Sequence, residues 1–460
     1  MAARLRTPTN YGPAALLGLC CVIGLIAGIE PKLALVAACA FAFALLIFIN
    51  FTIGVAFFAA VSFLEVLELG SGATVGKLGG GLVIFAWIAL LATGQNRTRT
   101  FFEDHPSVSF LLGAFLGWIL LGMTWAASQS DVMTALSRYI PNVALIPIIY
   151  TAARDKRGAM AVMIGLVIGA LLSVVYGVAN PGPEEARLEG SALDPNELAS
   201  VLVAGVALSA AFVANTKRGS VGRLAAICAV CFCVFGIFLT VSRGGLIALG
   251  VALVASIFLA GRWRPLAVIA TLLIACGGFY YFAVLAPPEA RERIASTSQG
   301  DNELKQGRTT IWKVAERIVK AKPVIGVGAN NFQDTARKYL LEPGALGRTD
   351  LIIATPRVVH NTWLGMAAEL GLIGLGMFVV IVLFCVGSAI RAARFFSALG
   401  DRGGEALARG LAVGLIGILV ADTFISQEYS KSLWILLGLG PALLGVAQRA
   451  MKASREREAI

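Results

Sequence analysis

The sequence predicts an all-α polytopic membrane protein with about twelve to fourteen transmembrane helices. Hydrophobic residues make up 58% of the 460 residues, charged residues make up 14%, and the mean hydropathy is +0.81. Soluble domains usually carry about 25% charged residues. Apolar stretches long enough to cross a hydrocarbon core of ~30 Å recur from Tyr11 to Val446. We therefore expect a single membrane domain over residues 1–460, with no separate soluble catalytic domain.

The apolar stretches define the expected spans in chain order. The first follows Arg4 and Arg6, as in a signal peptide, but no clear cleavage site precedes a mature soluble region, so we expect a retained helix. The second and third are the least regular and fit either two short helices or a re-entrant pair. The expected spans are 12–29, 33–49, 51–67, 80–94, 107–126, 139–152, 158–178, 198–214, 223–240, 244–261, 265–285, 360–388, 410–427 and 432–448.

Lys and Arg are distributed unevenly between the two faces that these spans define. With the N-terminus in the cytoplasm, twenty lie on the cytoplasmic side and six in the short loops opposite. The other twelve lie in one long loop, residues 286–359, and long loops are translocated despite their charge. The positive-inside rule therefore places this loop outside. The same rule accounts for the net charge of +11, so no nucleic acid partner is expected.

The long loop contains a predicted amphipathic helix from Arg308 to Lys322. Its apolar residues are spaced as one face of a helix, and Pro323 with a turn-rich Gly326-Val-Gly-Ala-Asn ends it. The apolar residues of this face are Ile311, Val314, Ala315, Ile318 and Val319. We expect this helix to lie over the membrane domain.

Cysteine and histidine usage gives no indication of a metal or cofactor. All eight cysteines lie within apolar spans, so a disulfide framework is not expected. The two histidines, His105 and His360, are far apart in the sequence and form no metal-binding pattern. The sequence also lacks a glycine-rich nucleotide-binding loop and a convincing internal repeat.

His360 is the first candidate for catalysis, because it lies where the polar loop meets an apolar span. Imidazole has an ordinary pKa near neutral pH. We interpret His360 as a candidate general base beside an anion site, and the alternative is a helix-capping or interfacial histidine. Asn361, which follows it, either orients the ring, binds a sugar hydroxyl or caps the helix.

Arginines in three external segments are candidates for an anion site. Arginine binds phosphate in bidentate fashion and stays charged in poorly hydrated places. The alternative for each is anchoring at the membrane interface. Arg243 is the most specific candidate, because it lies in a short turn where an unpaired charge costs roughly 2–3 kcal/mol. The candidates are Arg187, Arg243, Arg308, Arg337 and Arg357.

Several acidic and amide side chains surround these candidates in the sequence. Asp194 with Pro195 is typical of a helix start, and Asn196 is a further candidate for binding substrate. Glu369 lies nine residues after His360, on the opposite helix face, so we expect it to be a packing partner. Two further acids, Asp422 and Glu428, are potential partners for an arginine, and the sequence does not fix which.

Five short motifs together resemble the O-antigen ligase and O-antigen polymerase superfamily. The resemblance covers residues 180–385 well and the remainder only in hydropathy. The Arg-x10-Gly spacing of many polymerases does not occur after Arg187, Arg243, Arg308 or Arg337, so ligase is favoured. The motifs are Arg187 with Asp194-Pro-Asn-Glu-Leu-Ala, Ser242-Arg-Gly-Gly, Gly307-Arg-Thr-Thr-Ile-Trp, Pro323-Val-Ile-Gly-Val-Gly-Ala-Asn-Asn-Phe and His360-Asn-Thr-Trp-Leu-Gly.

The resemblance implies a GT-C-like glycosyltransferase of the bacterial inner membrane, with its site facing the periplasm. It implies a glycan donor on undecaprenyl diphosphate and a lipid A-core or growing-glycan acceptor. His360 would be the base, Arg243 and Arg308 would hold the diphosphate, and Arg187 would assist. Further expected substrate contacts are Asn196, Arg337, Arg357 and Asn361. Transfer would be metal-independent and would invert the anomeric carbon, because the hydroxyl attacks opposite the diphosphate.

Two classes of alternative stay open at this point. Within the superfamily, a polymerase of repeat units or a ligase that glycosylates protein fits the same motifs. Outside it, a membrane transporter is the rival class. A transporter would place ionisable residues near the membrane midplane and use repeated, discontinuous helices. The candidate charges gather at one face instead, which favours the enzyme.

Overall fold

The computed structural model confirms the all-α membrane class, since the residues it describes contain helices and no strand. Nine helices in this part of the chain are long and apolar enough to cross a membrane, and four further apolar helices are shorter. The predicted count of twelve to fourteen is therefore reached only with the shorter helices included. The described residues are 24–25, 27–63, 75–94, 99–181, 187–190, 194–295, 303–340 and 358–458.

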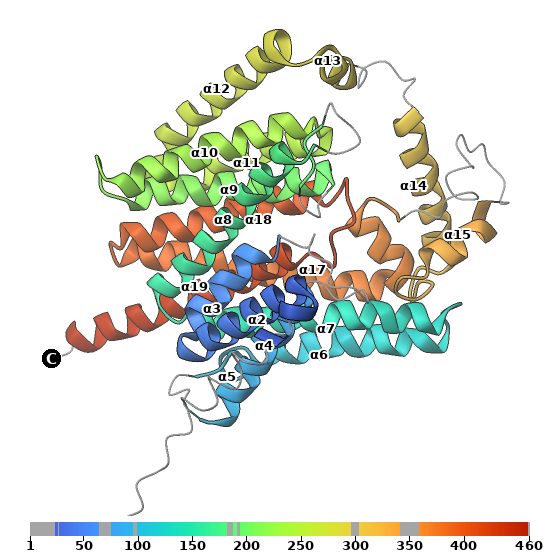
Figure 1. Ribbon diagram of the computed structural model, residues 1–460, viewed down its shortest axis with the longest axis horizontal. Helices are drawn as coiled ribbons and strands as arrows, with labels where there is room; N and C mark the ends of the chain where they lie inside the picture. The colour runs from blue at the N-terminus through green and yellow to red at the C-terminus, as the bar shows by residue number, and fades with distance from the viewer. Residues whose placement is uncertain are drawn as a thin grey trace, which may run out of the picture.

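The helices follow the order of the expected spans, with the first span lying mostly outside the described residues (Figure 1). The membrane-length segments are α6 Pro106–Leu121 extended to Thr124 by a 3-10 turn, α7 Gln129–Ala152, α8 Lys156–Ala179, α9 Pro195–Asn215, α10 Val221–Thr240, α12 Arg264–Tyr280 extended to Gly261–Leu285 by 3-10 and π segments, α17 Thr362–Ala398, α18 Arg402–Ala421 and α19 Lys431–Glu458. The shorter apolar helices are α2 Pro31–Ile49, α3 Phe51–Val61, α4 Val75–Ala92 and α11 Arg243–Leu259. Three helices belong to the long loop: α13 Pro288–Ala295, α14 Glu303–Ala321 and α15 Phe332–Leu340.

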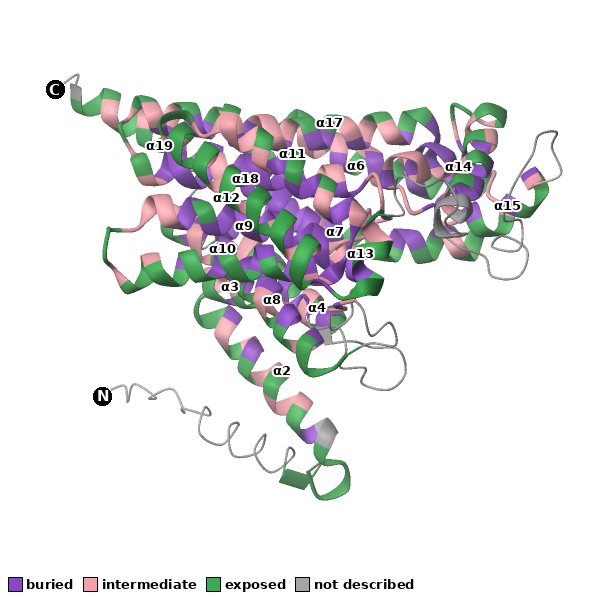
Figure 2. Ribbon diagram, turned by 90° about the horizontal axis from the view of Figure 1, so that it is seen from above, coloured by how far each residue is buried: buried purple, intermediate pink, exposed green. Residues whose placement is uncertain are grey.

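Helix α9 is largely buried and lies against α8, α10, α11 and α18. Small residues allow these backbones to approach closely. A Cβ added at Gly410 of α18 would lie 2.5 Å from the Ala211 Cβ of α9, and one added at Gly417 would lie 2.5 Å from Val203. Buried residues fill the interior of the bundle and exposed ones its outer surface (Figure 2). The outer surface carries large apolar side chains such as Phe110 and Phe258, as expected for contact with lipid.

The two ends of the bundle differ in their loops. At one end, called the basic end here, Lys156 pairs with Asp401 at 2.9 Å, and Arg449 donates to the Arg154 carbonyl at 2.7 Å. These residues come from the segments predicted to be cytoplasmic. The opposite end, called the loop end, carries α13, α14 and α15 (Figure 1). The predicted sorting of these loops to two sides is therefore reproduced.

Several helix boundaries differ from the predicted spans for local reasons. Helix α7 begins ten residues before predicted position 139, because Ser128 caps it and its interior prolines do not interrupt it. Helix α18 covers 402–421 and not 410–427, so that residues 422–430 form a turn at the loop end.

The predicted amphipathic helix of the loop is confirmed as α14. Its apolar face packs against Val327, Phe332 and Tyr339 of the following segment and against Ala368 of α17. The buried residues of that face are Ile311, Val314, Ala315 and Ile318. The loop helix therefore lies on the end of the membrane bundle, as expected.

A backbone contact fixes this loop to α17. Helix α17 is interrupted at Gly371, whose φ of +68° and ψ of −177° favour glycine. The segment 323–332 binds along this interruption: the amides of Val327 and Gly328 donate to the carbonyls of Ala368 and Glu369. We call this contact the latch.

Glu369 completes the latch with its side chain. Its carboxylate accepts hydrogen bonds from the amides of Asn330 at 2.8 Å and Phe332 at 3.2 Å. These contacts agree with a packing role for Glu369, whereas His360 precedes α17, so the argument from opposite helix faces does not apply. Asn331 adds a second attachment, because its side chain pairs with both backbone groups of Ser128.

Candidate active site

Arg243 is the first residue of α11, at the loop end of the bundle. Ser242 caps this helix, its hydroxyl accepting from the Gly245 amide at 3.1 Å. A guanidinium donor of Arg243 binds the Arg293 carbonyl of α13, which fixes the side chain beside the long loop. A helix N-terminus offers unsatisfied N–H groups and a positive dipole. Arg243 therefore adds its charge to a position that already favours anions.

The glycine pair after Arg243 allows two other segments to approach. A Cβ added at Gly244 would lie 2.8 Å from the Phe424 Cβ, and one added at Gly245 would lie 2.4 Å from the Ala199 Cβ of α9. The Ser242-Arg-Gly-Gly motif is therefore needed for packing around Arg243 as well as for its charge.

Arg187 lies beside this helix start, where it donates hydrogen bonds to Thr240 and Asn196. Its Nε donates to the Thr240 carbonyl at 3.1 Å, and its Nη2 donates to Asn196 Oδ1 at 3.4 Å. The same oxygen accepts from the Ser242 hydroxyl at 2.8 Å. Asn196 therefore connects α9, α11 and Arg187. Asp194 caps α9, as predicted, accepting from the amides of Asn196 and Glu197.

Arg308 on α14 brings a third guanidinium to the same place. Burial lowers the pKa of Arg308; Asp194 opposes this shift, while Arg187 and Arg243 add to it. Charges act on one another in this way only at short range in a protein. The structure therefore brings together three arginines that lie far apart in the sequence.

His360 lies between α14 and the start of α17. The indole of Trp312 donates to the carbonyl of Val359 at 3.0 Å, and Trp312 follows Arg308 by four residues, on the same face of α14. His360 itself has a left-handed backbone with φ of +54°. Asn361 caps α17 by accepting from the Leu364 amide at 3.0 Å, so the capping interpretation holds for its side-chain oxygen.

The turn 422–430 joins these parts. The Thr362 amide donates to the carbonyls of Asp422 and Ile425, both at 2.9 Å. Phe424 of the same turn contacts Gly244, as described above. The starts of α9, α11 and α17 thus surround one region at the loop end, together with the Arg308 face of α14 and this turn. We call this arrangement the arginine–histidine ring.

Two acids of this turn carry unusual electrostatics: Asp422 is buried and Glu428 is half-buried. Burial raises the pKa of Glu428 to about 7, although the Thr362 hydroxyl and Arg138 act in the opposite direction. Burial, with Glu428 nearby, also raises the pKa of Asp422 well above its ordinary value. Within the described residues neither carboxylate oxygen of Asp422 has a hydrogen-bond partner. The sequence left open which of the two acids pairs with an arginine, and within the described residues Asp422 forms no such pair.

Arg337 lies apart from the ring, and Arg357 lies outside the described residues. Arg337 is exposed on α15 and is not among the charges that act on Arg308. Among the residues that are described, no group of three or more His, Cys, Asp and Glu side chains is arranged to hold a metal ion.

Sequence reasoning missed one feature of the site, the convergence of three helix N-termini. Asp194, Ser242 and Asn361 are all capping residues of the preferred types, and each begins a helix at the loop end. Read together with the predicted topology, these caps were the signal that pointed to one anion-attracting region.

Part of the chain is similar to a known protein family. Residues 227–379 match a family model described as O-antigen ligase. The predicted resemblance to the O-antigen ligase superfamily is confirmed. The matched segment contains Arg243, Arg308 and His360, whereas Arg187 and Asn196 precede it. No curated protein is significantly similar to the chain.

One solved structure with a similar chain is described as "Structural coordination of polymerization and crosslinking by a peptidoglycan synthase complex". Its chain is 18% identical, the match covers 75% of this chain and 97% of that one, and the TM-score is 0.42. The similarity is low in both sequence and fold. The functional class therefore rests on the O-antigen ligase match, which supports membrane glycosyl transfer.

Proposed function

We propose that this protein is a ligase-type membrane glycosyltransferase with a GT-C-like fold. It moves a glycan from undecaprenyl diphosphate to a sugar hydroxyl of the lipid A-core. Two observations support this proposal: Arg187 and Arg243 act electrostatically on Arg308, and Trp312 of the same helix binds the carbonyl of Val359, next to His360. Three guanidinium groups, one of them at the N-terminus of α11, suit a diphosphate, which needs bidentate donors and positive charge.

The proposed step forms one glycosidic bond and breaks one bond to phosphate. The acceptor hydroxyl attacks the anomeric carbon opposite the diphosphate, and His360 takes the hydroxyl proton. The carbon–oxygen bond to the diphosphate breaks, so undecaprenyl diphosphate leaves with the bonding electrons. Arg243 and Arg308 stabilise the charge that develops on it. Because the donor is already activated, the step needs no nucleotide, and it inverts the anomeric configuration.

The proposed location is the bacterial inner membrane, with the ring facing the periplasm. The bias of Lys and Arg toward the basic end supports this orientation. The lipid-linked donor and the lipid acceptor would both approach the loop end from the outer leaflet. Arg337, Arg357 and Asn361 stay proposed contacts for the sugar parts of these substrates.

Electrophoresis of lipopolysaccharide from a deletion strain tests the proposal. A ligase deletion leaves lipid A-core without a side chain, and expression of the wild-type gene restores the long side chain. A deletion strain whose core carries one repeat unit would instead identify a polymerase. Unchanged lipopolysaccharide would contradict both assignments.

A further inference from the structure

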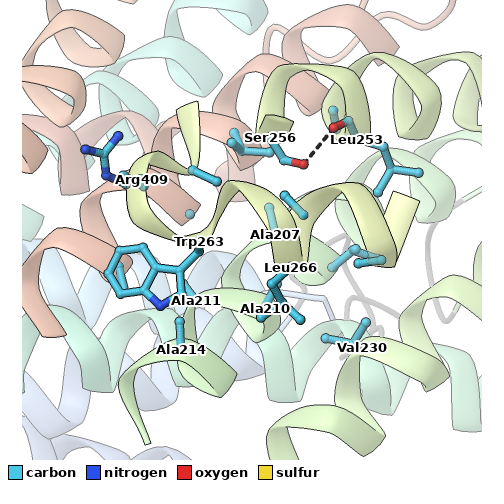
Figure 3. A pocket seen from close by; sticks show the side chains of 18 of the residues that line it. Ala207, Ala210, Ala211, Ala214, Val230, Leu253, Ser256, Trp263, Leu266 and Arg409 are labelled. Carbon is cyan, nitrogen blue, oxygen red and sulfur yellow. Dashed lines mark hydrogen bonds between the residues drawn. The ribbon is translucent and has the colours of Figure 1, made fainter. Parts of the chain in front are cut away.

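An apolar cavity lies between α9, α11, α12 and α18, away from the arginine–histidine ring. Its empty volume, including the part open to the surroundings, is about 850 Å³. Nine of its lining residues are alanine. Two of its polar side chains are occupied within the protein, since Ser256 donates to the Leu253 carbonyl and Arg409 binds Glu405. The walls therefore present hydrocarbon to any occupant (Figure 3).

Helix α12 covers one side of the cavity without closing it. No residue of α12 is buried, although Leu266, Ala267, Ala270 and Ile274 all line the cavity. A helix in this position leaves space that lipid can enter from the bilayer. Small lining residues give this space room for a narrow, flexible chain.

The depth of the cavity matches one leaflet of the bilayer. Along α9 it extends from Val203 to Ala214, eleven residues or about 16 Å at 1.5 Å per residue. This is half of a hydrocarbon core of ~30 Å. Ala214 and Ala260 lie at the basic-end termini of α9 and α11, so the cavity occupies the half of the bundle next to the basic end.

Positive charge surrounds the mouth of the cavity at the basic end. Arg262 and Arg409 share the carboxylate of Glu405 at 2.8 and 2.9 Å, and the Glu405 side chain is only 2% exposed. Arg264, the first residue of α12, is exposed beside them. Three arginines and one glutamate leave a net charge of +2. Trp263, at the end of the cavity, is typical of the membrane interface.

We infer that this cavity binds an anionic phospholipid of the leaflet at the basic end. One acyl chain fills the cavity, and the phosphate lies against Arg262 and Arg264. A phospholipid fits better than the donor tail, because the proposed diphosphate site is at the opposite end and its tail enters from the other leaflet. The preference for a phospholipid over the donor tail rests on the proposed function, whereas the apolar walls and the charged mouth of the cavity do not.

A lipid in this cavity would support the helix that leads to the ring. Helix α12 continues through the turn Tyr281–Leu285 into α13. The Arg293 carbonyl of α13 accepts the hydrogen bond from Arg243. Filling the gap behind α12 therefore stabilises the segment against which Arg243 is held.

Native mass spectrometry of the purified full-length protein tests the inference. The protein is mixed in detergent with phosphatidylglycerol, phosphatidylethanolamine of matched acyl chains, and undecaprenyl phosphate. We expect one tightly held phosphatidylglycerol, favoured about fivefold over phosphatidylethanolamine by the exposed arginine. Arg264→Gln should remove that preference, and the phosphatidylethanolamine adduct should stay unchanged.

Cavity-filling variants locate the site. Ala267→Phe on α12 and Ala210→Phe on α9 should each abolish the adduct, because both side chains occupy the cavity. Ile269→Phe, on α12 but outside the lining, should bind lipid as the wild type does. Equal phosphatidylglycerol binding in a folded Ala267→Phe or Ala210→Phe variant would overturn the inference. Preferential retention of undecaprenyl phosphate would also overturn it, by showing that the cavity takes the isoprenoid tail.

Discussion

His360 and Val241 both have left-handed backbone conformations, with φ of +54° and +48°. Such positions are uncommon for residues other than glycine, and most strained for a β-branched residue such as valine. The cost is about 1–3 kcal/mol at each, so the surrounding contacts must hold them in place. Val241 is buried against Ala286 and Ala290 of the long loop. Each of these residues lies directly before the N-cap of a helix in the arginine–histidine ring. The backbone of the site is therefore held in a defined conformation before substrate binds.

Replacing the candidate base tests its role directly. We expect His360→Ala to lower transfer by about 10²–10⁴-fold, the usual contribution of general-base catalysis. The protein should still elute as a folded species in detergent. His105→Ala provides the matched control, because the only other histidine packs against Phe101 and Phe384, away from the ring. Equal losses in the two variants would assign His360 a structural role.

Replacing Arg243 tests the diphosphate site. Arg243→Lys keeps the charge but loses the bidentate geometry, so donor affinity should fall about tenfold or more. Titration with undecaprenyl diphosphate measures this change. Arg402→Lys, an exposed change at the basic end, should leave affinity as it is. Wild-type affinity in Arg243→Lys would show that this arginine only anchors the helix.

The raised pKa of Glu428 predicts a pH dependence of stability. Because the folded protein raises the pKa from 4.5 to about 7, it favours the protonated acid. This stabilisation is complete below pH 4.5 and is lost as the pH rises through about 7. The contribution of this acid is at most about 3 kcal/mol.

Thermal unfolding at pH 5 and pH 8 measures the effect. The wild type should melt at a lower temperature at pH 8, and Glu428→Gln should reduce this difference, since glutamine resembles the protonated acid. Asp422 keeps part of the pH dependence, because its pKa is raised in the same direction. An identical pH dependence in both proteins would exclude Glu428 as a contributor.

At the scale of elements, the latch explains why glycine occurs both in the 323–328 segment and at position 371 of α17. Gly326 of Pro323-Val-Ile-Gly-Val-Gly and Gly371 of α17 lie against each other. A Cβ at Gly326 would lie 2.3 Å from the Glu369 carbonyl oxygen, and one at Gly371 would lie 2.2 Å from that of Val324. The latch holds α14, and therefore Arg308, on the membrane bundle.

A methyl group at Gly371 should open the latch. Gly371→Ala meets both the backbone of Val324 and an unfavourable φ, so we expect it to cost roughly 2 kcal/mol or more. Hydrogen exchange at the amides of Val327 and Gly328 should become faster, while the core of α9 stays protected. Gly376→Ala is the matched control in the same helix, because open space surrounds that position. Equal exchange in both variants would contradict the latch.

Among the elements, the spacing of apolar residues predicted which segments are helices better than it predicted where those helices begin and end. The apolar face of α14 was readable because its spacing matches 3.6 residues per turn. The interruption of α17 at Gly371 could not be predicted from the sequence, since glycine within an apolar span also occurs in unbroken helices. The start of α7 was placed too late, because its first residues are polar and capping by Ser128 decides where the helix begins.

At the scale of the whole molecule, the hydropathy pattern predicted the membrane class and the sorting of loops to two ends. Motif resemblance identified Arg243, Arg308 and His360; in the structure Arg243 acts electrostatically on Arg308, and Trp312 of the same helix as Arg308 binds the carbonyl of Val359, next to His360. The convergence itself depends on contacts between distant segments, such as Phe424 with Gly244. No local pattern in the sequence indicates which distant segments make these contacts. The burial of Asp422 and Glu428 was missed for the same reason.

The central claim is that the arginine–histidine ring transfers a glycan from a diphosphate carrier to an acceptor hydroxyl. The most direct test mixes the purified protein with an undecaprenyl-diphosphate-linked glycan and a lipid A-core acceptor, and determines the product by mass spectrometry and linkage analysis. We predict glycosylated lipid A-core with inverted anomeric configuration, formed by the wild type and not by His360→Ala. Transfer at the wild-type rate by His360→Ala, or a product with retained configuration, would contradict the account.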